Sequence, residues 1–372
     1  MFNIFGIWMD DKCIANSMVL TMIYGVSVIV LFIITPQFCH FIYMYKARDN
    51  VIAFADEFYV SMSSLMIVCK DFCLIKHKKK IKRLMKSMDS EIFRPESPEQ
   101  YKRIFEVVMG KYKKLFWLIS FVNVSFCVCV IINPLFDMNK TDTKYVLPLV
   151  DCYPFAVNDT PVYQIMYVYQ IFVCFYLMMH NYPFDVFIVD LLGFCIAECD
   201  VLCEQIDNLK LEISPSSYDR KLSTCIKHHK EISRFFQDVE RIFSFPILQQ
   251  YFCNLISSCT TMFRLSIAEP MSVDFFKTLS YQSCLLLQMF LYCWTASSLT
   301  EKSQKIPVLA YDSYRLDVKK STQSNLKLFI AKSQHPLLLK TLLFSLSMEQ
   351  YLQLIRNSFS YYTVLTSLNE DS

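Results

Sequence analysis

Glycine and charged side chains are both scarce in this chain, and each shortage narrows the class of protein. Only 4 of the 372 residues are glycine, which leaves few of the Gly-x-x-x-Gly faces that allow membrane helices to approach closely. Charged residues make up 19% of the chain, whereas 54% are hydrophobic and the mean hydropathy is +0.30. A soluble domain of this length is not usually so apolar, so the composition indicates a membrane protein.

Motifs for metal binding, catalysis and transport are also missing. The 16 cysteines include no pair of Cys-x-x-Cys motifs and no histidine-rich partner spacing, so we expect neither a metal site nor a cofactor. Most cysteines lie in apolar runs or basic segments, which is typical of reduced thiols. The chain has no nucleophile-elbow or zinc-protease motif, no inverted repeat and no aromatic-studded basic groove. These absences disfavour an enzyme, a common secondary transporter and a nucleic-acid-binding protein.

What the chain does contain is seven apolar runs, each long enough to cross a bilayer as a helix. They cover residues 18–43, 51–75, 115–136, 163–194, 242–263, 279–299 and 341–368. The fold class they predict is all-α, with residues 1–372 forming a single seven-transmembrane membrane domain.

Positive charge alternates along the connections between these runs. Most of the 37 lysine and arginine residues lie in the second-to-third, fourth-to-fifth and sixth-to-seventh connections. Short basic connections stay in the cytoplasm, so we predict a cytoplasmic N-terminus and an extracellular C-terminus. A G-protein-coupled receptor has the opposite orientation. The pattern therefore disfavours a metabotropic seven-span receptor, which we keep as an alternative.

Two N-glycosylation sequons begin at Asn139 and Asn158. Both lie in the third-to-fourth connection, which the charge pattern places outside the cell, so the two signals agree. Cys152 lies in the same connection. A disulfide to Cys39 is one alternative for it, and a free thiol is the other.

Two long cytoplasmic segments, residues 197–241 and 301–340, are predicted to form a helical anchor. In the first segment, apolar residues recur at helical spacing between charged ones, with a break near residues 213–217. These stripes favour packing of helix against helix, within or between subunits, over solvated stalks.

Three ionisable residues, His180, Asp185 and Asp190, lie within the fourth run. A carboxylate buried in a membrane is costly unless it has a partner. We therefore predict that this half of the helix lies at or below the cytoplasmic interface, with its carboxylates in water. The alternative is the acid–base pair of a membrane enzyme, which is disfavoured because side chains five residues apart do not face each other squarely on a helix.

The last run carries a polar stripe where a lipid-facing helix should be apolar. Its members recur at helical spacing on one face: Gln350, Gln353, Asn357, Ser360 and Ser367. Polar groups in hydrocarbon must face protein or water, so the stripe is either a seam against other helices or the wall of an aqueous pore. Its outer end runs into Val364 and Leu368, an apolar ring that would close such a pore by dewetting. Because one helix cannot enclose a pore, this second interpretation implies an oligomer.

The most specific motifs of the sequence lie in its C-terminal third. They run from His335-Pro-Leu-Leu-Leu through Leu343-Phe-Ser-Leu-Ser-Met-Glu-Gln-Tyr to Ser358-Phe-Ser-Tyr-Tyr-Thr-Val-Leu. In these motifs the chain resembles the insect odorant receptor family, whose inverted topology agrees with the charge pattern. One departure is Tyr314, where members of the family often carry tryptophan. The related gustatory receptors end in a different pattern, and a gustatory-type receptor channel is kept as an alternative.

The resemblance implies a subunit of a ligand-gated, non-selective cation channel in the plasma membrane of a sensory neuron. Four subunits would surround a central pore lined by the last span, with Val364 and Leu368 as its gate. The shared co-receptor of the family has a longer insertion between spans four and five. This chain lacks that insertion, so it looks like an odour-tuned subunit that assembles with the co-receptor.

In this family the odorant binds in the outer half of the bundle, between spans two, three, four and six. The resemblance therefore implies a site for a small apolar volatile, held by shape and dispersion, with tyrosine hydroxyls giving limited direction. The candidate residues are Phe58, Tyr59, Met62, Val124, Cys127, Val130, Tyr167, Tyr169, Ile171, Tyr281 and Cys284. The alternative for each of them is ordinary packing in the core of the bundle.

Overall fold

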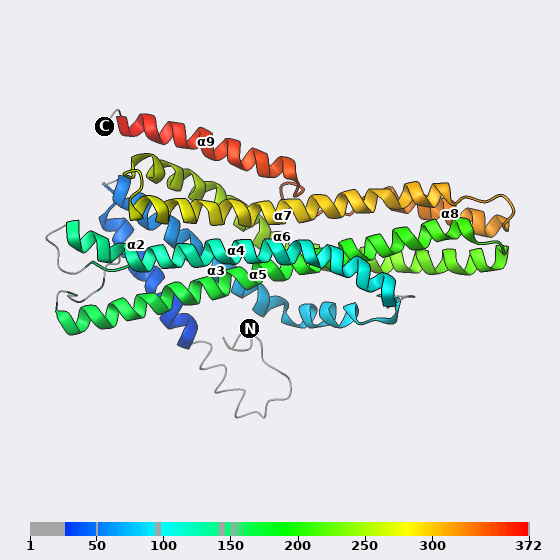
Figure 1. The fold of residues 1–372 in the computed structure, drawn as a ribbon, viewed down its shortest axis with the longest axis horizontal. Coiled ribbons are helices and arrows are strands. Elements are labelled where there is room, and N and C mark those ends of the chain that lie inside the picture. Colours follow the sequence, from blue (N-terminus) through cyan, green and yellow to red (C-terminus); the bar gives the residue numbers. More distant parts are fainter. Residues whose placement is uncertain are drawn as a thin grey trace, which may run out of the picture.

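The structure, a computed structural model, is an elongated bundle of long helices (Figure 1). It describes residues 27–49, 51–93, 98–140, 146–149, 153, 155, 157 and 159–370. Nearly all of these residues are helical, and within them a single antiparallel bridge joins Lys340 to Ser345.

The main helices follow one another along the chain. They are α2 (Thr35–Lys46), α3 (Val51–Met88), α4 (Pro98–Lys140), α5 (Thr160–Asn208), α6 (Pro215–Ile267), α7 (Val273–Asp312), α8 (Lys320–Ser333) and α9 (Met348–Glu370). Three short segments adjoin them, the π-helical η1 (Val30–Ile34) and the 3-10 helices η2 (Glu91–Phe93) and η3 (Leu209–Leu211). The apolar runs fall in η1 with α2, in α3 to α7, and in α9, and several of these helices continue far beyond the runs.

Length and composition alone identify only some of these helices as membrane spans. Within the described residues, the segments Ser27–Lys46 and Trp117–Pro134 are both long and apolar enough to cross a membrane by that test. Polar side chains interrupt the other runs, and several of these side chains are buried inside the bundle.

Proline and serine set several helix ends. Both α5 and α6 carry proline in their first turn, Pro161 and Pro215, where a missing N–H group costs little. Helix α7 begins after Ser272, whose hydroxyl accepts the N–H of Phe275 at 3.1 Å. The break between η3 and α6 lies at residues 212–214, beside the position predicted from the sequence.

The last helix begins later than the sequence predicted. Residues 341–347 form a turn, in which the Thr341 N–H and the Thr341 hydroxyl each donate to the Phe344 carbonyl at 2.8 Å. The Ser347 hydroxyl then accepts the N–H of Gln350 at 3.3 Å, in the first turn of α9. Hydroxyl side chains here compete with a helix for the backbone groups, an effect that apolar periodicity does not reveal.

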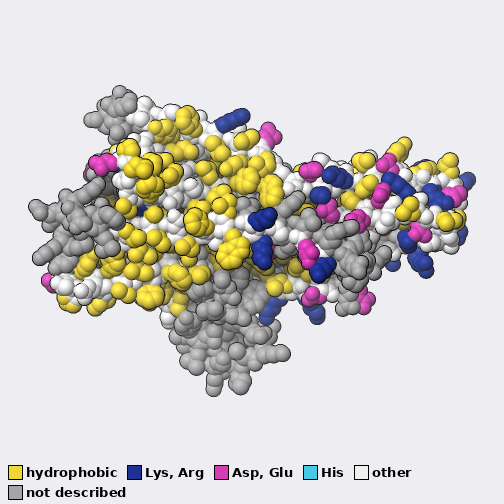
Figure 2. All heavy atoms as spheres, in the orientation of Figure 1, with side chains coloured by type: hydrophobic (Ala, Val, Ile, Leu, Met, Phe, Trp, Pro, Cys, Tyr) yellow, Lys and Arg dark blue, Asp and Glu magenta, His cyan; other side chains and the backbone are white. Residues whose placement is uncertain are grey.

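The two halves of the bundle differ in surface chemistry. Hydrophobic side chains cover the half in which α5 and α7 begin, and most charged side chains gather over the opposite half, which holds α8 (Figures 1 and 2). Among the apolar side chains, Phe121 is 72% exposed and Ile165 is 68% exposed. An apolar exterior suits hydrocarbon and a charged exterior suits water, so we propose that the first half lies in the membrane and that the second half is the cytoplasmic anchor.

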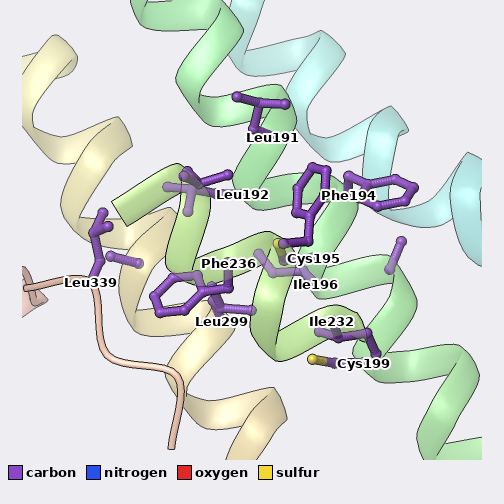
Figure 3. Close-up of a cluster of buried hydrophobic side chains, with 14 of the residues drawn as sticks. Leu191, Leu192, Phe194, Cys195, Ile196, Cys199, Ile232, Phe236, Leu299 and Leu339 are labelled. Atoms are coloured by element: carbon purple, nitrogen blue, oxygen red, sulfur yellow. The ribbon is translucent and has the colours of Figure 1, made fainter. Parts of the chain in front are cut away.

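The largest hydrophobic cluster lies around the junction of these halves and extends into the anchor. Side chains from α5, α6, α7 and the segment before α9 interdigitate there, including Leu192, Ile232, Phe236, Leu299 and Leu339 (Figure 3). None of these five is more than 3% exposed. The apolar stripes of the anchor are thus covered by helices of the same chain. Truncating one such leucine to alanine typically costs about 2–5 kcal/mol.

Buried polar contacts also join the helices of the anchor. His228 Nε2 lies 2.9 Å from Glu198 Oε2, and His228 Nδ1 lies 3.0 Å from Gln205 Oε1. Burial raises the pKa of the Glu198 carboxyl above its ordinary value, and the hydrogen bond and charge of His228 oppose this rise. Nearby, Lys302 Nζ pairs with Asp200 Oδ1 at 2.7 Å and ties α7 to α5.

The predicted modification sites fall at the connection between α4 and α5. Asn139 lies in the last turn of α4, but its side chain is outside the described part of the structure. Asn158 and Cys152 lie outside the described residues. Cys39 is a buried thiol. Glycosylation at both asparagines therefore stays a prediction.

His229 in the anchor should make stability depend on pH. Its imidazole packs edge-on against Phe329, with ring centroids 5.3 Å apart. Burial, and then the neighbouring His228, lower the pKa of His229 from 6.5 to about 4. Between these values the unfolded chain binds a proton that the folded chain does not, so acidification through this window removes stability. The unfolding temperature of the solubilised protein should fall from about pH 6.5 towards about pH 4.

Two histidine variants separate this effect from general acid denaturation. His229→Phe should reduce the slope of unfolding temperature against pH, because the variant no longer carries the half-buried imidazole. His335→Phe, at an exposed position, should retain the full slope. The same slope in both variants and the parent would contradict the assignment to His229.

Candidate functional site

A cavity of about 820 Å³ lies inside the membrane half of the bundle. Its walls come from α3, α4, α5 and α7, and the connection between α6 and α7 borders its outer end, where α7 begins. Small-molecule sites are concave, mostly apolar spaces of about 300–1,000 Å³. The cavity therefore has the size and position of a site for a small ligand.

Apolar and sulfur-containing side chains form most of the cavity wall. They include Val60, Met66, Ile67, Ile119, Phe126, Val130, Leu149, Cys174, Leu177, Met178, Leu285 and Leu291. Methionine and cysteine are polarisable, and methionine adapts its shape to irregular gaps. Such a wall binds a small apolar body through many weak dispersion contacts and gives it little directional guidance.

Four of the residues predicted for the ligand site line this cavity. They are Cys127, Val130, Tyr281 and Cys284. The Tyr281 hydroxyl lies 2.5 Å from Ser63 Oγ, and its ring packs on Phe126 with the centroids 5.2 Å apart. Tyr281 thus joins α7 to α3 and α4 at the cavity wall.

The other candidates do not line the cavity. The Tyr167 hydroxyl donates to the Ile131 carbonyl, and the Tyr169 hydroxyl donates to the Leu31 carbonyl, each at 2.6 Å. Val124 is 50% exposed on the outer face of α4. Phe58, Met62 and Ile171 are partly buried away from the cavity, and the side chain of Tyr59 is outside the described part of the structure. On α5 the cavity lies deeper than predicted, beside residues 174–186.

The inner end of the cavity is polar, a feature that the sequence did not predict. Asn181 and Asp185 on α5 and Gln288 on α7 line it. Lys70 Nζ on α3 lies 2.6 Å from Asp185 Oδ1 and 2.5 Å from Asn181 Oδ1. The Tyr292 hydroxyl also donates to Asp185 Oδ1 at 2.5 Å, and Gln288 Nε2 donates to Asp185 Oδ2.

The prediction that Asp185 lies in water is therefore wrong. Asp185 is 4% exposed and Lys70 is 2% exposed. The opposite charge and the surrounding donors offset the cost of burying the carboxylate. Lys70 itself was the available signal, because it is a lysine within an apolar run. The five-residue spacing predicted that His180 and Asp185 do not face each other squarely. In the structure His180 Nδ1 lies 3.3 Å from Asp71 Oδ1, whereas Asp185 Oδ1 lies 2.6 Å from Lys70 Nζ.

Amide side chains extend this polar network to α6. Gln250 Nε2 lies 2.8 Å from Gln288 Oε1 and 2.9 Å from Asn254 Oδ1. Asn254 in turn donates to the Leu285 carbonyl at 3.3 Å. A membrane interior offers no water to such groups, so their contacts with one another fix α3, α5, α6 and α7 relative to each other.

Charged side chains border the outer end of the cavity. Asp274 Oδ1 lies 2.6 Å from Lys277 Nζ, and Asp274 Oδ2 lies 3.1 Å from Arg264 Nη2. Burial opposes ionisation of Asp274, but Lys277 and Arg264 outweigh it and hold the pKa of the carboxyl below its ordinary value. In the preceding turn, Met271 has a φ of 65°, a backbone conformation that residues other than glycine seldom adopt.

The polar stripe of α9 does not pack into the core of its own subunit. Leu354 and Ser358, which are 1% and 0% exposed, face α6. The Ser358 hydroxyl lies 3.5 Å from the Leu255 carbonyl. The stripe lies on another side of the helix, where Gln353, Ser360 and Ser367 are exposed and Gln350 and Asn357 are partly exposed. Gln353 donates to Asn357 at 3.0 Å along the stripe. Val364 is 54% exposed, and the side chain of Leu368 is outside the described part of the structure.

The family model described as 7tm Odorant receptor matches residues 50–359. The chain belongs to this odorant receptor family. Over 297 residues it is 26% identical to odorant receptor 46a, isoform A, of Drosophila melanogaster, covering 78% of this chain and 76% of that relative. It is 22% identical to odorant receptor Or2 of Anopheles gambiae, covering 87% of each chain.

Solved structures share the fold of this odorant receptor. One is the insect olfactory receptor OR5 from Machilis hrabei in complex with eugenol, with a TM-score of 0.83 and 17% identity over 99% of this chain and 96% of that chain. The likeness identifies a seven-transmembrane helical fold, as the seven apolar runs predicted. The relatives named above are odorant receptors and not enzymes, which agrees with a multi-pass membrane receptor and disfavours the membrane-enzyme alternative.

The ion pair at the inner end of the cavity should be essential for stability of this receptor. Lys70→Met leaves the Asp185 carboxylate buried without its cation, which typically costs about 3–5 kcal/mol. The solubilised variant should unfold at a markedly lower temperature. The double variant Lys70→Met with Asp185→Leu removes both charges and should recover much of this loss.

Lys76→Met is the matched control, because Lys76 lies on the same helix and is exposed. Its unfolding temperature should stay close to that of the parent. A single Lys70→Met variant as stable as this control would show that the pair contributes nothing.

Proposed function

We propose that this receptor is an odour-tuned subunit of a ligand-gated, non-selective cation channel. The observation that carries the proposal is the apolar cavity of about 820 Å³ in the membrane half of the bundle. Its size suits a small volatile, and the similar receptor from Machilis hrabei is described in complex with eugenol. The ligand would lie among α3, α4, α5 and α7 and be held mainly by dispersion.

The pore would be lined by α9. Its polar stripe is exposed on the isolated subunit, which supports a face that meets either neighbouring subunits or water. Several copies around an axis could enclose a conduit, with Val364 and Leu368 as an apolar constriction at its outer mouth. We propose a tetramer of this chain with a co-receptor of the same fold, inserted in the plasma membrane of sensory dendrites.

Opening requires that the ligand binds the open arrangement more tightly than the closed one. The cavity and α9 both contact the α6–α7 pair: Gln288 lines the cavity, while Ser358 packs on α6. A ligand that changes the packing of α7 on α6 would therefore alter the support of α9. To move the pore from mostly closed to mostly open, the difference in affinity must reach about 5.5 kcal/mol, shared among the bound ligands.

Filling the cavity should weaken the odour response while leaving the channel assembled. Cys127→Phe adds a ring to the wall, where the Cys127 thiol lies 3.6 Å from the Met178 sulfur. In cells that co-express the co-receptor, the odorant concentration for half-maximal response should rise by roughly 5- to 150-fold, which corresponds to the about 1–3 kcal/mol that overfilling typically costs.

Val124→Phe is the control for this experiment, since Val124 lies on the same helix but faces outwards and is 50% exposed. It should leave the concentration for half-maximal response nearly unchanged. Equal loss in both variants would place the ligand elsewhere.

Weakening the constriction of α9 should increase current in the absence of odorant. Val364→Ala and Leu368→Ala remove apolar surface from the ring, so the pore should hydrate more readily. Basal cation current per receptor at the cell surface should rise by several-fold in the double variant. Leu352→Ala, on another exposed side of α9, serves as a control for general loosening of the helix. Unchanged basal and evoked currents in the double variant would refute the gate assignment.

A further inference from the structure

Two asparagine side chains line the cavity at about the same level of adjacent helices. Asn123 on α4 and Asn181 on α5 both line it. One turn towards the outside, the Cys127 thiol contacts the Met178 sulfur at 3.6 Å, and on the inner side the Ser120 hydroxyl donates to Tyr182 at 2.7 Å. The two asparagines lie between these bridges, at matching heights on adjacent helices.

The orientation of each amide is set by a contact on its far side. Lys70 Nζ donates to Asn181 Oδ1 at 2.5 Å, so the oxygen of that amide is already engaged. Asn123 Nδ2 donates to the Ile119 carbonyl at 2.8 Å, so the nitrogen of the other amide is engaged. What each amide has left is complementary: Asn181 retains an N–H donor, and Asn123 retains a carbonyl acceptor.

Neither remaining group has a hydrogen-bond partner within the described part of the chain. Asn181 Nδ2 and Asn123 Oδ1 are not among the fully buried side-chain atoms that lack a hydrogen-bond partner. Both atoms are therefore accessible to a molecule in the cavity. The other polar groups at this end are committed to one another, because Asp185 accepts from Lys70, Tyr292 and Gln288. The charges of Lys70 and Asp185 also offset each other, so an ionised ligand finds no counter-charge at this inner end.

We infer that the receptor selects ligands that carry a hydroxyl group, that is, alcohols with a compact apolar body. The hydroxyl oxygen accepts from Asn181 Nδ2, and its proton is donated to Asn123 Oδ1. An ether or a ketone can accept from Asn181 but cannot donate to Asn123. A hydrocarbon would cover both amides and satisfy neither, which is costly in an apolar site. This inference rests on the proposed function, since it specifies the ligand class of the same cavity.

Isomeric ligand pairs test the inference without a mutation. Benzyl alcohol and anisole have the same atoms and nearly the same size, as do n-octanol and methyl heptyl ether. The complex with the co-receptor is exposed to each pair, and two readouts are taken. They are the evoked current and the rise in unfolding temperature of the purified complex, which reports binding independently of gating. In at least one pair the alcohol should be effective at a concentration roughly tenfold lower than its isomer.

Variants then assign the preference to the two amides. The quantity compared is the half-maximal concentration of the ether divided by that of the alcohol. Asn123→Leu should lower this ratio towards one, and Asn181→Leu should do the same. Met178→Leu, an apolar change on the same cavity wall, should keep the parent ratio. Since Asn181 also contacts Lys70, Asn123→Leu is the decisive variant if Asn181→Leu fails to fold.

The outcomes separate the two proposals. Preferential thermal stabilisation by alcohols without any evoked current would support the inference and refute the channel function. Evoked currents that are equal for alcohol and ether in both pairs would overturn the inference and leave the channel function standing. An alcohol preference that survives Asn123→Leu unchanged would also overturn it.

Discussion

Inside a membrane, a lysine and an aspartate that face each other have no water to solvate them, and this constraint organises the membrane half of the receptor. Lys70 on α3 and Asp185 on α5 are both buried and lie 2.6 Å apart. Tyr292 and Gln288 on α7 complete the environment of the carboxylate, and Gln250 carries the network to α6. Because leaving any member unpaired is expensive, the four helices have few alternative registers. The cavity lies directly beside this fixed point.

The membrane half and the anchor differ in their proposed roles, and this difference follows from the same physical chemistry. In the membrane half, mostly apolar walls surround the cavity, and the polar network closes its inner end. In the proposed anchor, a large hydrophobic cluster and the Glu198–His228 contact join the helices to one another. Helices α5, α6 and α7 run through both halves, so the helices that border the cavity also pack in the large hydrophobic cluster. Among the described side chains of α9, those that pack on α6 and α7 lie on one face, and the polar stripe lies on another side of the helix.

Composition and charge pattern were sufficient to predict the helical class and the positions of most helices, because both depend on local sequence. The cavity depends on which face of each helix turns inwards, and the sequence of a helix that is apolar all round gives little indication of that face. Val124 and Cys127 are both apolar residues of the same run, yet of these two only Cys127 lines the cavity. Asp185 was misplaced because its partner is 115 residues away on another helix. The start of α9 was missed because hydroxyl groups of Thr341 and Ser347 capture backbone groups.

The central claim is that a ligand in the cavity opens a pore lined by the polar stripe of α9. Accessibility of substituted cysteines tests it most directly. A charged thiol reagent applied from outside to Gln353→Cys receptors, assembled with the co-receptor, should block the current much faster while odorant is present. Leu354→Cys, whose side chain faces α6, should react slowly under both conditions. If Gln353→Cys reacts at the same rate with and without odorant, or reacts without affecting the current, α9 does not line a ligand-opened pore.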